Sequence, residues 1–128
     1  GGFPEAAPRQ RPGYNRSATL IASAKQAPAL RELRLYDNLL GALPATIGRL
    51  RRLRELHLRG NHLTALPESI GDLAELRHLD LRATRLRELP GTLARLPRLE
   101  KLDLRWTKLS VLPDWLPELR ARGCVVLL

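Results

Sequence analysis

Few side chains in this 128-residue sequence have the chemistry that catalysis requires. The one cysteine, Cys124, could act as a nucleophile only beside a base, and the nearest histidine expected on its surface is His78. If Cys124 and His78 lie on strands two positions apart in the sheet, the distance between them is about 10 Å. We therefore predict no catalytic residues. The absence of methionine indicates a segment of a longer protein, so any catalytic activity would belong to another domain.

A metal site is the other chemistry that these side chains could support. His57 and Asp80 are expected side by side on adjacent strands, with His78 nearby. A specific zinc site needs a further strong ligand and hydrogen-bonded outer partners, which this group lacks. We therefore expect an ordinary surface His–Asp pair and no metal. No other cofactor is expected, because the phosphate-binding patterns GxxxxGKS/T and GxGxxG are absent.

The elements that position these side chains repeat every 23 residues. From Leu30 the chain reads LRELRLYDNLLGALPATIGRLRR, and matching frames start at Leu53, Leu76 and Leu99. A fixed period of this length indicates a solenoid, in which each repeat is one structural unit. Within every frame two leucines stand two positions apart, so on a strand they share one face and point inward. These doublets are Leu33 and Leu35, Leu56 and Leu58, Leu79 and Leu81, and Leu102 and Leu104.

Each frame predicts one parallel strand on the concave side and a short helical or 3-10 segment on the convex side. The proline of each LP pair suits the first position of the convex segment, because it fixes φ and needs no donor. Asn38 and Asn61 follow their strands and would bond the backbones of neighbouring turns, whereas Thr84 and Thr107 leave this ladder incomplete. The expected fold class is α/β, a curved solenoid with a parallel concave sheet.

Four kinds of segment are expected along the chain. Residues 1–16 are rich in proline, glycine and arginine, as in a flexible linker. Residues 17–29 predict an N-terminal helical cap, or a decayed repeat with the same covering role. Residues 30–121 hold four repeats, at 30–52, 53–75, 76–98 and 99–121. Residues 122–128 are expected to form a C-terminal capping strand.

The last strand is apolar on both faces. A fifth frame starting at Arg122 would alternate inward and outward residues: inward Val125 and Leu127, outward Cys124, Val126 and Leu128. Two interpretations are open. The segment is either a short cap half covered by Trp115 and Leu119, or an edge at Gly123–Leu128 that pairs with another domain or a second copy of the chain.

The outward strand positions form columns across the repeats, and one column holds Arg59, Arg82 and Arg105. Arg, Tyr and Trp are the residue types that most often anchor interfaces, and the concave sheet is the usual binding surface of a solenoid. We predict a partner-binding surface made of nine residues: Arg34, Tyr36, His57, Arg59, Asp80, Arg82, Asp103, Arg105 and Trp106. The alternative is a solvated ladder of Arg–Asp pairs, each worth about 0–1 kcal/mol. Reversal of the three arginines to Glu is expected to leave the fold intact.

Composition narrows the class of partner. The net charge is +9, but the arginines are scattered and aromatics make up 4% of the chain. Net charge alone is weak support for nucleic-acid binding, so binding to nucleic acid or an anionic surface is the alternative to a protein partner. No run of 18 apolar residues is present, so no membrane span is expected. A single cysteine cannot form an internal disulfide, which favours a reducing, cytoplasmic location.

The framed positions resemble the leucine-rich repeat family in its 23-residue form, LxxLxLxxNxLxxLPxxIGxLxx, over residues 30 to 128. The LPxxIG half is present at Leu43–Gly48 and Leu66–Gly71 and weakens in the last two repeats. The closing stretch Leu116–Leu128 is similar to the C-terminal cap of repeat domains in type III secreted effectors of plant-pathogenic bacteria. This resemblance implies binding of a host protein, which could be a ubiquitination substrate, after delivery into the host cytoplasm.

Overall fold

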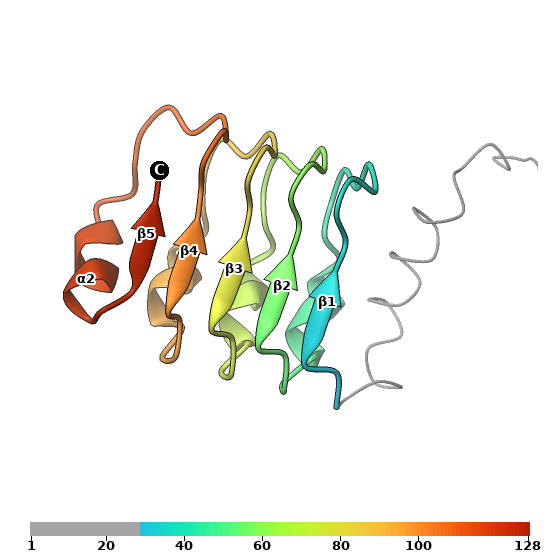
Figure 1. The fold of residues 1–128 in the computed structure, drawn as a ribbon, viewed down its shortest axis with the longest axis horizontal. Helices are drawn as coiled ribbons and strands as arrows, with labels where there is room; N and C mark the ends of the chain where they lie inside the picture. Colours follow the sequence, from blue (N-terminus) through green and yellow to red (C-terminus); the bar gives the residue numbers. More distant parts are fainter. Residues whose placement is uncertain (1–28) are drawn as a thin grey trace, which may run out of the picture.

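A computed structural model describes residues 29–128 of the protein. Five parallel strands lie side by side in one sheet, in the order in which they follow along the chain (Figure 1). They are β1 (Glu32–Arg34), β2 (Glu55–His57), β3 (His78–Asp80), β4 (Lys101–Asp103) and β5 (Val125–Leu127). The predicted solenoid of parallel strands is therefore confirmed. The expected linker at 1–16 and all but the last residue of the expected cap at 17–29 lie outside the described residues.

Short helices form the opposite layer, behind the strands in Figure 1. They are the 3-10 helices η2 (Ala45–Arg49), η3 (Glu68–Asp72) and η4 (Gly91–Arg95), and the α-helix α2 (Leu116–Ala121). Pro44 lies just before η2, in an extended conformation with ψ 148°. Its carbonyl accepts the N–H of Ile47 at 3.0 Å, which closes the first turn. The proline thus precedes the helix, one residue earlier than the sequence analysis placed it.

The space between the layers is filled with aliphatic side chains. All eight doublet leucines are buried, as predicted, and they belong to one continuous core cluster. The convex turns approach each other closely, which explains the glycine of the IG pairs. A Cβ on Gly71 would lie 2.6 Å from Thr92 Cβ, and one on Gly48 would lie 2.8 Å from the Ser69 carbonyl oxygen. The close spacing of the turns therefore requires a residue without a side chain at these two positions.

Asn61 joins the first two repeats through a fully satisfied amide. Its nitrogen donates to the carbonyls of Leu35 at 2.6 Å and Leu58 at 2.9 Å. Its oxygen accepts the backbone N–H groups of Asn38 and Leu40. Thr84, at the corresponding position of the third repeat, donates one bond, to the Leu81 carbonyl of its own repeat. The side-chain link between turns is therefore absent at Thr84. This confirms the prediction that threonine at this position leaves the asparagine ladder incomplete.

The predicted frame of the last strand is wrong by one residue. Strands β1 to β4 pair at intervals of 23, but Leu102 of β4 lies opposite Val126. Cys124 and Val126 are buried, whereas Val125 is 52% exposed on the outward face. The placement of Cys124, Val125 and Val126 is thus the reverse of the expected one, whereas Leu128 at the C-terminus is exposed. Leu127 is half-buried.

The shift arises because a true α-helix replaces the fourth 3-10 turn. At the end of α2 the N–H of Gly123 donates to the Arg120 carbonyl and that of Cys124 to the Leu119 carbonyl, both at 3.0 Å. This pair of bonds, with Gly123 at φ +97°, is the Schellman ending of an α-helix. It adds a residue before β5 and buries Cys124 beside Leu119.

The outer edge of β5 is partly covered by its own helix. The Arg120 guanidinium donates to the Val126 carbonyl at 3.0 Å, and Trp115 packs against the core from the same segment. These contacts give the edge an internal hydrogen-bond partner, which favours the capping interpretation over pairing with another chain.

Candidate functional site

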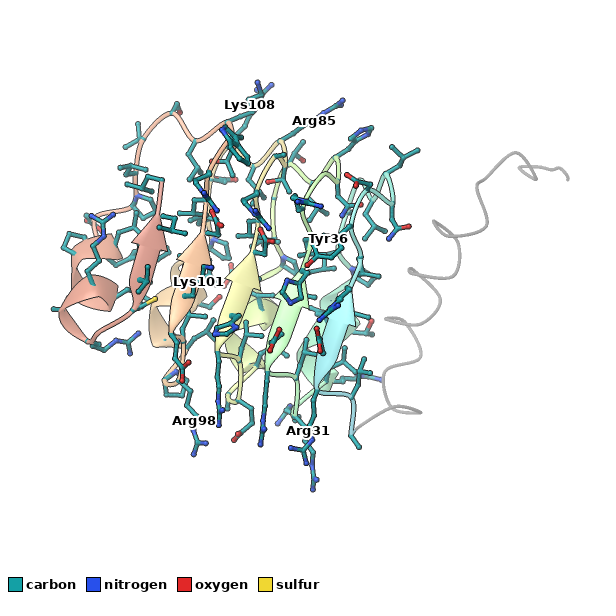
Figure 2. All side chains as sticks on the ribbon, viewed as in Figure 1. Arg31, Tyr36, Arg85, Arg98, Lys101 and Lys108 are labelled. Atoms are coloured by element: carbon teal, nitrogen blue, oxygen red, sulfur yellow. The ribbon has the colours of Figure 1, made fainter. Side chains whose placement is uncertain are left out.

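Side chains of β2 to β4, together with Tyr36, Arg82 and Arg105 from the turns after the strands, line a hollow on the outward face of the sheet. Tyr36 and Lys101 mark this face in Figure 2. Its lining includes six of the nine residues predicted to bind a partner: Tyr36, His57, Asp80, Arg82, Asp103 and Arg105. Arg34, Arg59 and Trp106 lie outside the lining. Leu79, His78 and Lys101 also contribute to it, and the prediction omitted them.

Two carboxylates in this hollow are buried beneath arginines. Asp80 is 7% exposed and Asp103 is 3% exposed. Each carboxylate accepts two hydrogen bonds from one guanidinium. Arg82 Nε and Nη2 donate to Asp80 Oδ1 and Oδ2 at 2.9 and 2.6 Å. Arg105 Nε and Nη2 donate to Asp103 Oδ1 and Oδ2 in the same way, at 2.9 and 2.7 Å. Arg82 Nε also lies 3.4 Å from Asp103 Oδ2, which links the pairs across two strands. The pairing of the ladder alternative is present, but its carboxylates are buried rather than solvated.

The environment of these carboxylates favours their charged form. Burial raises the pKa of the Asp80 carboxyl, but hydrogen bonds from the Arg82 side chain and backbone, with the nearby positive charge, outweigh it and hold the pKa below its usual value. The pKa of Asp103 is lowered by the same balance, with Arg105 as its partner. Two fixed anions therefore hold two guanidinium groups in defined positions at neutral pH.

Two members of the arginine column, Arg59 and Arg105, lie against aromatic rings. The Arg59 guanidinium carbon lies 4.9 Å from the centre of the Tyr36 ring, and that of Arg105 lies 5.4 Å from the centre of the Trp106 ring. Trp106 is 68% exposed. Cation–π contacts of this kind orient the guanidinium without neutralising it. Arg34 is exposed and paired with Glu32.

The turn that follows each strand is a feature that the sequence analysis missed. Asp37, Gly60, Ala83 and Trp106 occupy one column and all have positive φ, between 52° and 79°. In this conformation the N–H of Ala83 reaches the Arg105 carbonyl of the next repeat at 3.0 Å. Gly60 and Asp37 were the available signals, because these residue types tolerate the left-handed region. The same turn carries the exposed Trp106 beside Arg105.

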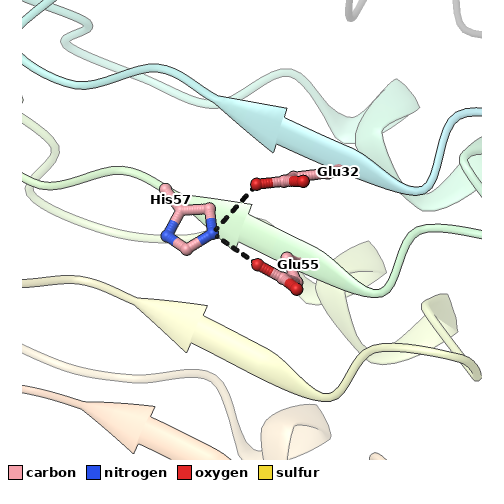
Figure 3. A group of neighbouring side chains, drawn as sticks. All are labelled: Glu32, Glu55 and His57. Carbon is pink, nitrogen blue, oxygen red and sulfur yellow. Dashed lines mark hydrogen bonds and ion pairs between the residues drawn. The ribbon is translucent and has the colours of Figure 1, made fainter.

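A second polar group lies on β1 and β2, where Glu32 and Glu55 face His57 (Figure 3). His57 Nε2 lies 3.0 Å from Glu55 and 3.9 Å from Glu32. The hydrogen bond from His57 lowers the pKa of Glu55. His57 Nδ1 is buried, has no hydrogen-bond partner among residues 29–128 and faces Asp80 Oδ2 at 3.9 Å.

These three side chains could hold a cation, but each carboxylate already has a partner. Glu32 pairs with Arg34 and Glu55 with His57, so we assign the group to the polar network of the sheet. The expected pairing of His57 with Asp80 across adjacent strands is present, at 3.9 Å between Nδ1 and Oδ2. His78 lies beside Glu55 and Glu100, at 3.9 and 3.7 Å.

Cys124 is not on the surface that carries His78. It is buried on the inward side of the sheet, which corrects the outward placement expected from the sequence. Burial raises the pKa of its thiol, so the protonated form dominates at neutral pH. The two side chains lie on opposite faces of the sheet, so His78 cannot act as a base for Cys124. Within residues 29–128, the helices are all too short to cross a bilayer.

Comparison with known proteins agrees with this geometry. Residues 15–122 match the family model described as a leucine-rich repeat region. A leucine-rich repeat protein of Leptospira interrogans is 35% identical over 80% of this chain, with a TM-score of 0.71. An internalin of Listeria monocytogenes is 17% identical over 77% of the chain, with a TM-score of 0.64, and shares the fold. The alignments cover 26% and 31% of those two chains. No curated protein matches this sequence.

Proposed function

We propose that this chain, which belongs to the leucine-rich repeat family, binds a protein partner through the concave face of its sheet. Leucine-rich repeat domains generally mediate protein–protein interaction, and the fold is typically a non-catalytic module. The partner-binding residues are the nine named from the sequence, with His78 and Lys101 added from the lining of the hollow. Because the chain spans about a quarter to a third of these structural neighbours, the activity of a whole protein is a separate question.

One observation carries this proposal: the guanidinium groups of Arg59, Arg82 and Arg105 are held in place before any partner arrives. Asp80 and Asp103 orient two of them, and Tyr36 orients the third. A side chain that is already ordered loses little entropy on binding, so its contacts contribute more of their free energy. Each guanidinium has five N–H donors, and the aspartates use two of them, which leaves donors for acceptors on a partner.

The class of partner follows from the neighbours of these arginines. Trp106 and Tyr36 add aromatic surface at the same side of the sheet. A protein segment with hydrogen-bond acceptors beside an apolar side chain would satisfy both kinds of group. Polar ligands without an apolar part would leave Trp106 unused.

We further propose that the chain is the repeat domain of a secreted bacterial effector. The similarity of Leu116–Leu128 to effector caps supports this, and both structural neighbours are bacterial proteins. The partner would then be a host protein, such as a ubiquitination substrate, in the host cytoplasm. Affinity capture from host and bacterial lysates, followed by mass spectrometry, identifies the partner and separates these two sources.

The test of the binding face uses a variant that leaves the buried carboxylates paired. Arg59→Ala with Trp106→Ala removes one arginine and one exposed apolar side chain from the concave side. The control, Arg49→Ala with Val111→Ala, removes an arginine from the convex helix η2 and an exposed apolar side chain from the loop that precedes α2. We expect the concave variant to lose the captured partner about tenfold or more, and the control to retain it. Equal retention by both folded variants would refute the concave site.

Reversal of all three arginines to Glu is not suitable for this purpose. The sequence predicted that this change leaves the fold intact, but Arg82 and Arg105 neutralise buried carboxylates, so we now expect it to destabilise the fold. Glu at either position would place a second negative charge against an anion that has lost its partner. Loss of binding in that variant would not distinguish a lost contact from a lost fold.

A further inference from the structure

A second charged surface lies where the strands begin. Arg31, Arg54 and Arg77 immediately precede β1, β2 and β3. Their backbones are joined in sequence, because Arg54 N–H donates to the Arg31 carbonyl at 2.7 Å and Arg77 N–H to the Arg54 carbonyl at 2.8 Å. Their Cα atoms therefore follow the strand spacing of about 4.8 Å. Figure 2 shows Arg31 and Arg98 at this end of the sheet, with Arg85 and Lys108 at the opposite end.

Further arginines gather around this row. Two hollows lie here, and we call their charged lining the strand-entry rim: Arg31, Arg51, Arg52, Arg54, Glu75, Arg77, Arg98, Glu100 and Arg122. The arginines that the sequence analysis regarded as scattered are thus brought together by the stacking of the turns. Arg51 and Arg52 lie in the turn that follows η2, and Arg54 lies just before β2.

The positive charge of the strand-entry rim is only partly balanced. Arg98 pairs with Glu75 at 3.2 Å. Two arginines donate to carbonyls, Arg51 to Gly48 and Arg122 to Leu96, and keep their full charge. Within the part of the chain that the structure describes, the remaining four have no ion pair: Arg31, Arg52, Arg54 and Arg77. Like charges at this spacing repel each other, and an anionic ligand would relieve the repulsion.

We propose that the strand-entry rim binds an extended, Asp- and Glu-rich segment of a protein partner. The row consists of arginines, whose planar forks match carboxylates in two-pronged hydrogen bonds. Arg98 already binds a carboxylate here, that of Glu75. This surface is distinct from the concave face and does not depend on it.

Two other polyanions fit less well. Single-stranded nucleic acid is bound by aromatic rings that stack on bases, and no aromatic residue lines the two hollows. Membrane surfaces are bound by basic side chains together with inserted apolar ones. The exposed large apolar residues of the described chain are Trp106, Val111, Leu112, Val125 and Leu128, and the lining includes none of them.

The test measures binding of a fluorescent polyglutamate peptide to the full chain by anisotropy, at about 150 mM salt so that long-range attraction is screened. The rim variant is Arg31→Gln, Arg52→Gln and Arg54→Gln. The control is Arg85→Gln, Arg87→Gln and Lys108→Gln, three exposed residues that line one hollow, and Figure 2 shows Arg85 and Lys108 at the opposite end of the strands. Both variants lose three positive charges, and unfolding curves check that both fold, since Arg54 is half-buried.

We expect the rim variant to lose about tenfold in affinity and the control less than about twofold. The concave variant at Arg59 and Trp106 should bind the peptide as the native chain does, so this result is independent of the concave site. Equal losses in the rim and control variants would overturn the proposal, because net charge alone would then explain binding. Tighter binding of a single-stranded oligonucleotide, or of phosphatidylserine vesicles, than of the peptide would also overturn it.

Discussion

Removal of one guanidinium tests whether the buried carboxylates are held by their arginines. In Arg82→Gln the Asp80 carboxylate keeps one hydrogen bond, from the backbone N–H of residue 82 at 3.1 Å. It loses two charge-assisted hydrogen bonds and, with them, the positive charge of the Arg82 guanidinium. Asp80 belongs to strand β3 and is only 7% exposed, so its carboxylate cannot reach water unless the sheet is disturbed.

The expected cost lies between two known limits. Exposed ion pairs contribute about 0–1 kcal/mol, and loss of one partner of a fully buried pair costs about 3–5 kcal/mol. The Asp80 side chain is 10% exposed and that of Arg82 is 24% exposed, so the pair is intermediate. We expect a loss of about 2 kcal/mol in the free energy of unfolding at neutral pH. For a domain of this size the midpoint of thermal unfolding would fall by about 8 °C or more.

The cost should depend on pH in a direction that the structure dictates. In the native protein the folded pKa of Asp80 lies below its unfolded value. The ionised Asp80 therefore stabilises the fold at pH values above its pKa in the unfolded chain, about 3.9. This stabilisation is lost as the pH falls through the pKa of Asp80 in the folded protein. In Arg82→Gln the Asp80 carboxylate is still buried, but it no longer has the hydrogen bonds and positive charge of Arg82 to offset that burial. The pKa of Asp80 in the folded state therefore rises, and protonation of Asp80 favours the folded state. The difference between the two proteins is thus largest near neutral pH and shrinks on acidification.

Urea unfolding of both proteins at about pH 7 and about pH 3 measures this difference. Arg85→Gln is the matched control, because Arg85 is exposed and has no carboxylate partner among the described residues. It should change the free energy of unfolding by less than about 0.5 kcal/mol. A cost for Arg82→Gln that equals the control, or that is the same at both pH values, would refute the buried-pair reasoning.

Three further changes test the packing of the repeats by thermal or urea unfolding. Leu81→Ala should cost about 2–5 kcal/mol, because it opens a cavity in the aliphatic core, and a negligible loss would contradict the inward placement of the doublets. Gly71→Ala should cost about 1–3 kcal/mol, because its Cβ would overlap Thr92. Gly91→Ala, where a Cβ meets nothing within 4 Å, is its control, and equal effects would rule out steric overlap as the cause. Asn61→Thr should cost about 1–3 kcal/mol through backbone groups left without partners, and an unchanged stability would show that the amide link between repeats is dispensable.

The repeating part of the fold could be predicted from the sequence because its signal is local and redundant. Every frame contains one LxL doublet at the same position. Because side chains alternate between the two faces of a strand, the doublet identifies which residues point inward and which point outward. The same argument failed at the C-terminus, where there is no further frame to confirm the register. The extra residue before β5 follows from the α-helical ending at Gly123, which depends on how Leu119 and Cys124 pack.

The candidate site was predicted less completely. The columns of outward residues placed Arg59, Arg82 and Arg105 on successive strands, and Arg82 and Arg105 do line the hollow. The sequence analysis considered Arg–Asp pairs only as exposed ones. Each aspartate is buried beneath the arginine two residues further along the chain, and Arg82 also reaches Asp103 of the next strand. The burial depends on how these side chains pack, and the spacing of the residues alone does not give it. The group of Glu32, Glu55 and His57 was missed for the same reason.

By itself, the sequence determined the period, the inward doublets and the parallel order of the strands. These features follow from covalent geometry and from the need to bury leucine, and both act within a single repeat. Only the tertiary structure decided which carboxylates are buried, how the last strand is paired and where the dispersed arginines meet. Those outcomes depend on distances between side chains of different repeats, which are set by the stacking of one turn on the next.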